Sequence, residues 1–269
     1  MEKQIYSALT IAGSDSGGGA GIQADIKTMH SRGVFATSVI TAITAQNTLG
    51  VQAVHCVPCD IIAAQIDSLA DDDFNIRAFK IGMLGTADII ETVAAKLRQI
   101  GDKFGSCVLD PVMIAKGGAP LLEKDAVSAL KRELLPLAKV ITPNLPELKE
   151  LTGITVKSDK DAAEAAKILQ DGGVECVVIK GGHGEDEICL DRVFTSSGNF
   201  ALENPRINTR HTHGTGCTFS ACIAAELAKG ADLSLAIKIA NQGIYAAIKN
   251  SPAIGKGQGG VNHWEFQKI

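Results

Sequence analysis

The sequence predicts an α/β protein in which helices cover both faces of a mainly parallel central sheet. Short β-branched runs alternate with longer segments of helical periodicity along most of the chain, a pattern typical of βαβ units. The short runs are apolar throughout, as expected for strands buried on both faces. No linker, repeat or low-complexity tract interrupts the pattern, so residues 1–269 are expected to form a single domain.

The predicted elements follow this alternation from the N-terminus. Apolar runs predict strands at residues 8–11, 38–43, 78–81, 107–109, 140–142 and 176–179. Helical periodicity predicts helices at residues 21–31, 61–69, 87–100, 124–134 and 159–170. Beyond Lys180 the order changes, because residues 187–194 and 199–207 flank a Ser-Ser-Gly turn and predict a hairpin. Helices at 218–229 and 233–249 and a glycine-rich segment at 255–260, expected to be flexible, complete the chain.

The charge and composition argue against nucleic acid or an anionic membrane surface as the main partner. The formal net charge is −4, and no block of like charges occurs. No apolar run approaches the ~20 residues that span a bilayer. The first residues lack the basic-then-apolar layout of a signal peptide. We therefore expect a cytoplasmic protein without a membrane partner.

The cysteines favour reduced thiols over a disulfide framework. There are seven of them, an odd number at irregular spacing. Cys56 and Cys59 have the spacing of a redox or metal pair, with His55 beside them. Because no second pair of this kind follows, two half-buried thiols are the favoured interpretation.

Residues 211–218 (His-Thr-His-Gly-Thr-Gly-Cys-Thr) precede a run of strong helix formers. Gly214 and Gly216 allow a tight turn and the close approach of a ligand. The first helical N–H groups lack partners and the helix dipole favours negative charge, so this turn predicts an anion site. A thiolate is stabilised at such a position, which makes Cys217 the best candidate for a reactive cysteine. The alternative is a tight turn and an N-cap around a small buried cysteine.

A glycine-rich loop at residues 13–21 follows the first strand and opens a helix. Neither the dinucleotide fingerprint nor the Walker A spacing is present. Its place at the carboxyl end of a strand favours ligand contact around Asp15 over a purely structural turn. Gln46, at the end of the next strand, could read an amide-like or aminopyrimidine edge, because its amide both donates and accepts. A solvated side chain is the alternative for Gln46.

Three further strand ends carry side chains with two possible roles each. Met83 and Val112 could wall a flat apolar pocket or belong to the core. Asp110, before a proline, could bind a cation or phosphate-bound magnesium, or could cap the backbone. Asn144 and Glu147 have capping-box spacing, and the same oxygens could hold a hydrated Mg²⁺.

Lys180 ends another strand and is placed to meet a phosphate. The lone His183 that follows is more typical of a surface loop than of a ligand. His211 and His213 flank the anion loop, but no third ligand of metal-site spacing is apparent. Loops that gather glycine, amide, carboxylate and lysine groups at one edge of a parallel sheet suggest phosphoryl transfer, where positioning and electrostatics dominate.

These motifs, in this order, resemble the ribokinase-like superfamily. More closely, they resemble the bacterial hydroxymethylpyrimidine/phosphomethylpyrimidine kinases of thiamin biosynthesis. The resemblance spans nearly the whole chain, and its last motif, Thr-His-Gly-Thr-Gly-Cys-Thr-Phe-Ser, is highly specific. The segments that carry it are residues 9–25, 45–48, 80–84, 109–113, 142–147, 180–183 and 212–220.

The resemblance implies a three-layer α/β/α ribokinase-like fold and a small-molecule kinase. Such an enzyme uses ATP and Mg²⁺ to phosphorylate hydroxymethylpyrimidine and then its monophosphate, and it is expected to be a homodimer. Gln46 would pair with the aminopyrimidine. The other residues implied to line this pocket are Gly13, Ala20, Met83 and Val112.

The resemblance also implies which residues handle the phosphates. The anion hole over the transferred phosphoryl group would comprise Gly214, Thr215, Gly216 and Cys217, with Cys217 as general base or transition-state stabiliser. Asp110, Asn144 and Glu147 would handle magnesium and phosphates. The groups implied to lie near ATP are Lys180, Gly182 and residues 255–260.

Four features bear on the comparison within the superfamily. Most members of the superfamily have Asp at the position of Cys217. The branch that this chain resembles has Cys there, as this chain does. The family usually has a lysine near the nucleotide at the position where this chain has Asn241. Lys238, one helical turn earlier, could take over the role of that lysine. The sister pyridoxal kinases use a lid cysteine at Ala115 and lack the Ala-Gln-Asn triplet containing Gln46, which favours the pyrimidine here. The alternatives are a pyridoxine or pyridoxal kinase and a non-catalytic sensor of a pyrimidine or nucleotide.

Overall fold

The computed structural model describes residues 5–72, 74–114, 118, 121–123, 125–182 and 187–269, and these form one nine-stranded sheet in the order β3-β2-β1-β4-β5-β6-β7-β8-β9. Pairing is parallel from β2 through β7, whereas β3, β8 and β9 join antiparallel. The predicted, mainly parallel sheet is confirmed. The strands are β1 (Tyr6–Asp15), β2 (Val34–Asn47), β3 (Gly50–Cys56), β4 (Ile76–Ile81), β5 (Ser106–Leu109), β6 (Val140–Ile141), β7 (Cys176–Ile179), β8 (Ile188–Thr195) and β9 (Gly198–Pro205).

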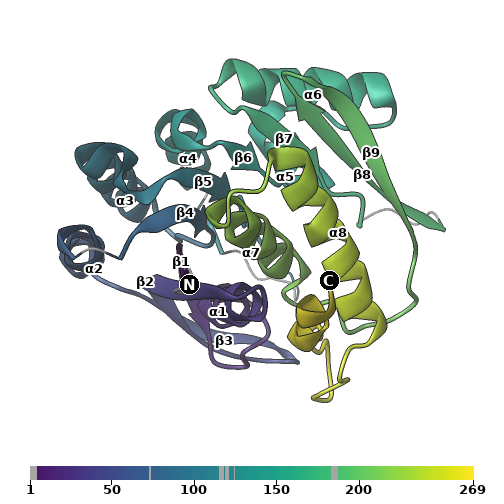
Figure 1. Ribbon diagram of the computed structural model, residues 1–269, viewed down its shortest axis with the longest axis horizontal. Coiled ribbons are helices and arrows are strands. Elements are labelled where there is room, and N and C mark those ends of the chain that lie inside the picture. Colours follow the sequence, from purple (N-terminus) through teal and green to yellow (C-terminus); the bar gives the residue numbers. More distant parts are fainter. Residues whose placement is uncertain (1–4, 73, 115–117, 119–120, 124, 183–186) are drawn as a thin grey trace.

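Helices cover both faces of this sheet and produce the expected three layers (Figure 1). One face carries α2 (Cys59–Asp71), α3 (Ala87–Ile100), α4 (Ala126–Glu133), α5 (Leu145–Thr152) and α6 (Asp159–Asp171). The other carries α1 (Gly21–Ser31), α7 (Thr215–Ala228), α8 (Leu233–Lys249) and the 3₁₀ helix η3 (His263–Lys268). Two short 3₁₀ turns, η1 (Gly101–Phe104) and η2 (Leu135–Leu137), connect elements. Within the described residues, no helix is long and apolar enough to cross a bilayer.

Most predicted elements are present, and the differences have physical reasons. The hairpin beyond Lys180 is confirmed as β8 and β9. Strand β2 runs 14 residues rather than the predicted core of six, because its end continues as a ribbon with β3. Strand β3 was not predicted, since it lies at the edge and most of its residues are exposed rather than apolar and buried. Helix α5 was also not among the predicted helices, although its cap was recognised. The start of the predicted helix at 124–134 falls partly on Lys124, which lies outside the described residues.

Helix α7 is the central element of its layer. It packs against β4 and β5 on one side and against α1 and α8 on the other, and nearly all of its residues beyond Cys217 are buried. A helix that is apolar all round is expected in such a position. Its N-terminus therefore lies at the carboxyl edge of the sheet, beside the loops that follow β1, β4 and β5.

Candidate active site

The predicted turn at the N-terminus of α7 is confirmed. Gly214 is the residue before the first helical turn and has a left-handed φ of 76°. A Cβ there would lie 1.7 Å from the carbonyl oxygen of Gly19, so only glycine fits. Thr218 donates its backbone N–H to the Gly214 carbonyl at 2.9 Å, which closes the first turn. The anion loop, residues 214–217, thus lies directly on the glycine-rich loop that follows β1.

Cys217 lies half-buried at this turn, and its thiol is a weak acid. Burial raises the pKa of Cys217 to about 11, while the nearby Lys80 ammonium lowers it. The stabilised thiolate expected from the helix N-terminus alone is therefore wrong for this structure. At neutral pH the thiol carries its proton and can donate a hydrogen bond.

On the far side of the anion loop, Lys180 and Asp110 form an ion pair. Lys180 Nζ lies 2.9 Å from Asp110 Oδ1, and Thr142 donates to the same oxygen at 3.2 Å. Burial alone would raise the pKa of Asp110, but Lys180 and Lys80 lower it, so the side chain is a carboxylate. A Cβ on Gly216 would lie 3.1 Å from Lys180 Nζ and 3.4 Å from Asp110 Oδ2. The structure therefore brings three predicted residues together across the loop.

Asn144 and Glu147 form the predicted capping box of α5. Glu147 Oε2 accepts the Asn144 N–H at 2.8 Å, and Asn144 Oδ1 accepts the Glu147 N–H at 2.9 Å. Burial raises the pKa of Glu147 to about 7; Lys180 lowers it and Asp110 raises it. A backbone bridge links Asn144 to Lys180, so this cap and the Asp110–Lys180 pair are neighbours.

These carboxylates fit a magnesium ion shared with a substrate. Among the described residues, no group of three or more His, Cys, Asp or Glu could hold a metal by itself. Mg²⁺ commonly takes one or two protein carboxylates and completes its shell with water and phosphate oxygens. Burial is the main cause of the raised pKa of Glu147 and the Asp110 carboxylate adds to it, so a cation between these two side chains would favour the ionised form of Glu147.

The loop after β1 is organised by Asp15. Its carboxylate accepts backbone N–H groups from Gly17 at 2.8 Å, Gly19 at 3.0 Å and Ala20 at 2.8 Å. Burial alone would raise the pKa of Asp15, but a hydrogen bond from His213 and these amides lower it. The glycine-rich loop is thus folded around a buried negative charge.

The predicted pyrimidine-pocket residues follow adjacent strands. Met83 is buried against Gly13, where a Cβ would lie 3.0 Å from the Met83 sulfur. Ala20 begins α1 and is tied to Asp15. Val112, half-buried, follows Asp110 at the end of β5. The structure joins Met83 to Gly13, and places Ala20 and Val112 on neighbouring loops of the same edge.

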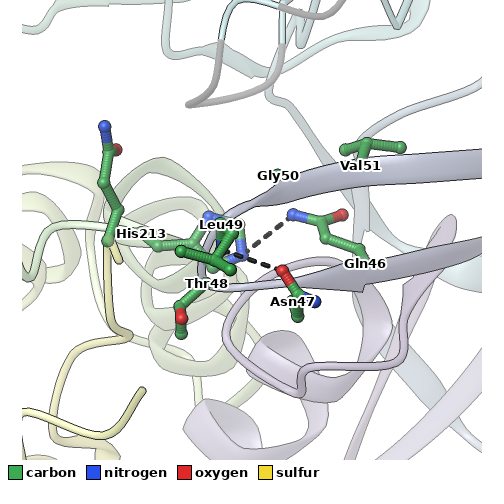
Figure 2. A pocket seen from close by; sticks show the side chains of 8 residues that line it. Gln46, Asn47, Thr48, Leu49, Gly50, Val51 and His213 are labelled. Carbon is green, nitrogen blue, oxygen red and sulfur yellow. Dashed lines mark hydrogen bonds between the residues drawn. The ribbon is translucent and has the colours of Figure 1, made fainter. Parts of the chain in front are cut away.

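Gln46 at the end of β2 faces His213, which directly precedes the anion loop (Figure 2). The Gln46 amide and His213 Nε2 are 3.1 Å apart, and His213 Nε2 lies 2.9 Å from Asp15 Oδ2. Gln46 and His213 also line a small cavity with the β2–β3 turn and Gln258. Sequence reasoning identified Gln46 and Asp15 but gave His213 no partner. The packing of the loop before α7 against the ends of β1 and β2 brings these three residues together.

A second buried ion pair lies beneath the site and was not predicted. Lys80 and Asp25 are both fully buried, with Lys80 Nζ 2.8 Å from Asp25 Oδ2. Burial alone would lower the pKa of Lys80, but Asp25 and Cys217 raise it. Thr10 donates to the same Asp25 oxygen at 2.6 Å, while Asp25 Oδ1 has no hydrogen-bond partner among the described residues. The only signal in the sequence was an ionisable residue inside each of two apolar segments.

The residues expected near ATP are only partly grouped. Asn241 is buried and bonds to Asp191 and Asn204, whereas the Lys238 ammonium lies 5.5 Å from the centre of the Phe200 ring. The contact of Lys238 with a nucleotide stays a prediction. Gly182 is exposed and follows Lys180 by two residues. Ala115 and His183 lie outside the described residues.

The glycine-rich segment at 255–260 is ordered rather than free. Gly257 and Gln258 donate backbone N–H groups to Thr48, and Gly259 donates to His211 Nδ1 at 3.2 Å. The segment thus packs beside the β2–β3 turn and the approach to the anion loop. The expectation of flexibility is wrong for this reason.

The cysteine pair at Cys56 and Cys59 has no disulfide, and both residues are half-buried, as expected. Burial raises the pKa of Cys56, and Glu123 adds to this shift. Within the described part of the chain no metal-binding group includes them.

Comparison with known proteins shows the family of this chain. The phosphomethylpyrimidine kinase family model matches residues 15–262. A hydroxymethylpyrimidine/phosphomethylpyrimidine kinase of Haemophilus influenzae is 57% identical, over 98% of this chain and 99% of that protein. Similar solved structures include a Bacillus subtilis pyridoxal kinase in an ADP complex (TM-score 0.89, 40% identity, 99% of this chain and 100% of that one). A Clostridium difficile phosphomethylpyrimidine kinase has a TM-score of 0.80 and 39% identity, over 91% of this chain and 100% of that one. The chain therefore belongs to the phosphomethylpyrimidine kinase family.

Proposed function

We propose that residues 1–269 act as one kinase domain that transfers the γ-phosphoryl group of ATP to 4-amino-5-hydroxymethyl-2-methylpyrimidine, and then phosphorylates the monophosphate to the diphosphate, in thiamin biosynthesis. One observation carries this proposal. Gly214 packs on the Gly19 carbonyl and Gly216 packs on the Asp110–Lys180 pair, so the anion loop separates the Gln46 side from the Lys180 side. A phosphoryl group on that loop would face an acceptor on one side and a nucleotide on the other.

The roles of the residues follow from this placement. In the first step the hydroxymethyl oxygen forms a bond to the γ-phosphorus, the bond from that phosphorus to the bridging oxygen of ADP breaks, and the hydroxyl proton passes to water. The backbone amides at the N-terminus of α7 stabilise the charge on the transferred group; within the loop, the Thr215 N–H already bonds to the Thr212 carbonyl at 3.4 Å. Lys180 balances the phosphate charge. Magnesium at Asp110 and Glu147 would neutralise phosphate oxygens and hold ATP in line.

Cys217 is assigned as a transition-state stabiliser rather than a general base. A thiol with a pKa of about 11 holds its proton at neutral pH. It is therefore a poor base and a competent hydrogen-bond donor to a phosphoryl oxygen. Phosphoryl transfer through a loose transition state needs positioning and charge stabilisation more than a strong base.

The deciding experiment measures ADP release with Mg-ATP and three acceptors: hydroxymethylpyrimidine, its monophosphate and pyridoxal. We expect turnover of both pyrimidines well above that of pyridoxal. A preference for pyridoxal would identify a vitamin B6 kinase with a pyrimidine side activity. Tight pyrimidine binding without any ADP release would identify a sensor.

We propose phosphorylation of pyridoxal only as a side activity, because similar solved structures are named pyridoxal kinases. Gln46→Ala separates the two substrates. Loss of the amide should reduce pyrimidine kcat/KM by roughly 100-fold, since two hydrogen bonds to the aminopyrimidine edge are lost. Pyridoxal turnover should fall far less. Equal losses for both substrates would count against the pairing assigned to Gln46.

We further propose that the enzyme is a cytoplasmic homodimer whose partner surface includes the β2–β3 ribbon. Three apolar side chains of this ribbon are exposed: Ile43, Leu49 and Val54. Ile43 pairs with His55 and Val54 with Thr44, so Ile43 and Val54 lie on opposite faces of the ribbon. Exposed apolar side chains on an edge ribbon are typical of a subunit interface.

A further inference from the structure

His213 presents a proton to two neighbours through one nitrogen atom. Asp15 accepts the N–H groups of Gly17, Gly19 and Ala20, so its oxygens act only as acceptors. His213 Nε2 lies 2.9 Å from Asp15 Oδ2. Two acceptors facing each other at this distance would repel, so Nε2 carries the hydrogen. This conclusion holds whether the imidazole is neutral or charged.

The orientation of the Gln46 amide follows from that proton. The amide lies between His213 Nε2, at 3.1 Å, and Thr44 Oγ1, at 3.3 Å. Thr44 has a single hydroxyl hydrogen, which it gives to the Ser14 carbonyl at 2.8 Å. Thr44 Oγ1 must therefore accept from the amide nitrogen. The amide oxygen then faces His213, the reverse of the orientation shown in Figure 2, which would place two N–H donors against each other.

The His213 ring is held in place on several sides. A Cβ on Gly19 would lie 2.6 Å from His213 Cδ2, so the ring packs directly on that glycine. The His213 backbone N–H donates to the Gly259 carbonyl at 3.1 Å. The side chain is 12% exposed, and that of Asp15 is 4% exposed. Because the ring is held on several sides, its Nε2–H group keeps one direction and can determine which atom of the Gln46 amide faces it.

We infer that His213 is a specificity-determining residue: anchored by Asp15, it fixes the polarity of the Gln46 amide so that the substrate meets one acceptor next to one N–H donor. This rests on the proposed pairing of Gln46 with the pyrimidine. The Gln46 amide oxygen accepts from His213, and the amide nitrogen donates to Thr44. The oxygen therefore keeps one lone pair for the substrate, and the nitrogen keeps one hydrogen. A 4-aminopyrimidine offers the complementary edge, an amino donor beside a ring-nitrogen acceptor. A 4-oxopyrimidine offers the reverse order and is rejected.

The test compares the 4-amino substrate with its 4-oxo counterpart, 5-hydroxymethyl-2-methylpyrimidin-4-one, in coupled ADP release. The unchanged enzyme should favour the amino compound by about 100-fold in kcat/KM, since two hydrogen bonds are mispaired with the oxo compound. His213→Leu keeps the bulk but has no donor, so the amide can rotate and the preference should fall at least roughly tenfold. His213→Gln is the matched control, because its terminal N–H can replace Nε2–H and should retain most of the preference.

Several outcomes would overturn the inference. An unchanged amino-to-oxo ratio in His213→Leu, with both rates lowered alike, would give His213 a purely structural role. Should His213→Leu fail to fold, ¹H–¹⁵N spectra of the unchanged enzyme decide: Nε2 is expected to be protonated at neutral pH, and a bare Nε2 would refute the assignment. Gln46→Leu separates this test from the pairing itself, because an unaffected pyrimidine rate there would remove Gln46 from the pocket altogether.

Discussion

Two buried lysines, each paired with one aspartate, set the charge at the site. Lys180 pairs with Asp110 beside the anion loop, and Lys80 pairs with Asp25 beneath it. Burying a charge costs several kcal/mol unless a partner and further hydrogen bonds compensate. The Lys180 pair can exchange partners with an incoming phosphate. The Lys80 pair is fully enclosed and joins β4 to α1, so it holds this helix on the sheet, and its ammonium lowers the pKa of Cys217.

Removing Lys80 should destabilise the protein strongly. Lys80→Met leaves Asp25 as an unpaired buried carboxylate, and the free energy of unfolding should fall by about 3–5 kcal/mol. Adding Asp25→Leu should recover part of that loss in a double-mutant cycle from urea unfolding. Lys96→Met, which breaks a more exposed pair with Asp67, is the control and should cost less than about 1 kcal/mol. Additive losses in the cycle would show that Lys80 and Asp25 are not coupled.

Replacing the thiol of Cys217 should lower turnover without weakening nucleotide binding. Loss of one donor to a developing phosphoryl charge costs on the order of 100-fold in kcat, so Cys217→Ala should show that decrease. Cys217→Ser restores an O–H donor and should recover a large part of it. ADP affinity, measured by calorimetry, should change little. A Ser variant as impaired as the Ala variant would contradict a donor role.

The reactivity of the same thiol should depend steeply on pH. Because burial raises the pKa of Cys217 to about 11, the thiolate fraction grows about tenfold per pH unit below that value. Alkylation of Cys217 by iodoacetamide, followed by peptide mapping, should therefore accelerate about 100-fold between pH 7 and pH 9. A rate that is already maximal at pH 7 would instead indicate a stabilised thiolate.

At the scale of elements, the C-terminal η3 helix closes the layer of α1, α7 and α8. Phe266 is fully buried, and a Cβ on Gly243 of α8 would lie 2.2 Å from its ring. His263 of the same helix is 9% exposed and bonds to Thr218 of α7 at 3.0 Å. The end of the chain therefore supports the first turn of α7, next to the anion loop.

This docking should make stability fall in mild acid. Burial lowers the pKa of His263 to about 4, against 6.5 for the free side chain. Between these values the unfolded chain binds a proton that the folded protein does not, so stability is lost as pH falls. The contribution is about 1.4 kcal/mol per pH unit, or about 3 kcal/mol in total. Urea unfolding from pH 7 to pH 4.5 should show this slope reduced in His263→Gln, and unchanged in the control His55→Gln. Equal slopes in both variants would rule His263 out as the source.

At the scale of the whole molecule, the two edge strands of the sheet, β3 and β9, are both largely exposed. Strand β9 is backed by α8, whereas the β2–β3 ribbon continues past the helical layers (Figure 1). Ile43 is 54% exposed on this ribbon and Leu49 is 70% exposed. The same ribbon carries Gln46, so a subunit contact there would lie beside the substrate pocket.

The proposed dimer should depend on this ribbon. Ile43→Asp places a charge in the apolar surface and should shift the sedimentation coefficient from dimer to monomer at micromolar concentration. Ile168→Asp, at an exposed position of α6 on the opposite part of the molecule, is the matched control and should leave the dimer intact. A monomeric unchanged protein, or a dimer insensitive to Ile43→Asp, would place the interface elsewhere or remove it.

Local spacing was sufficient for the parts of the molecule whose contacts are local. The alternation of apolar runs and helical periodicity predicted the parallel sheet and both helical layers, because each strand and helix encodes its own buried face. The capping box at Asn144 and Glu147 and the turn at Gly214 span a few residues each, and both were predicted correctly. Strand β3 was missed because an exposed edge strand carries no buried apolar pattern.

Long-range pairing decided what the site can do. Lys80 and Asp25 are 55 residues apart, Gln46 and His213 are 167 apart, and Asp15 and His213 are 198 apart. No periodicity links such positions, since only the packing of α1 and of the loop before α7 on the sheet makes them neighbours. The burial of Cys217 also depends on tertiary structure. A helix N-terminus alone predicts a lowered thiol pKa, but the layers packed around Cys217 raise that pKa. The sequence by itself therefore determined the fold class and the anion loop. The tertiary structure alone decided the ionisation of Cys217 and the contacts that orient Gln46, because both depend on what the folded layers enclose.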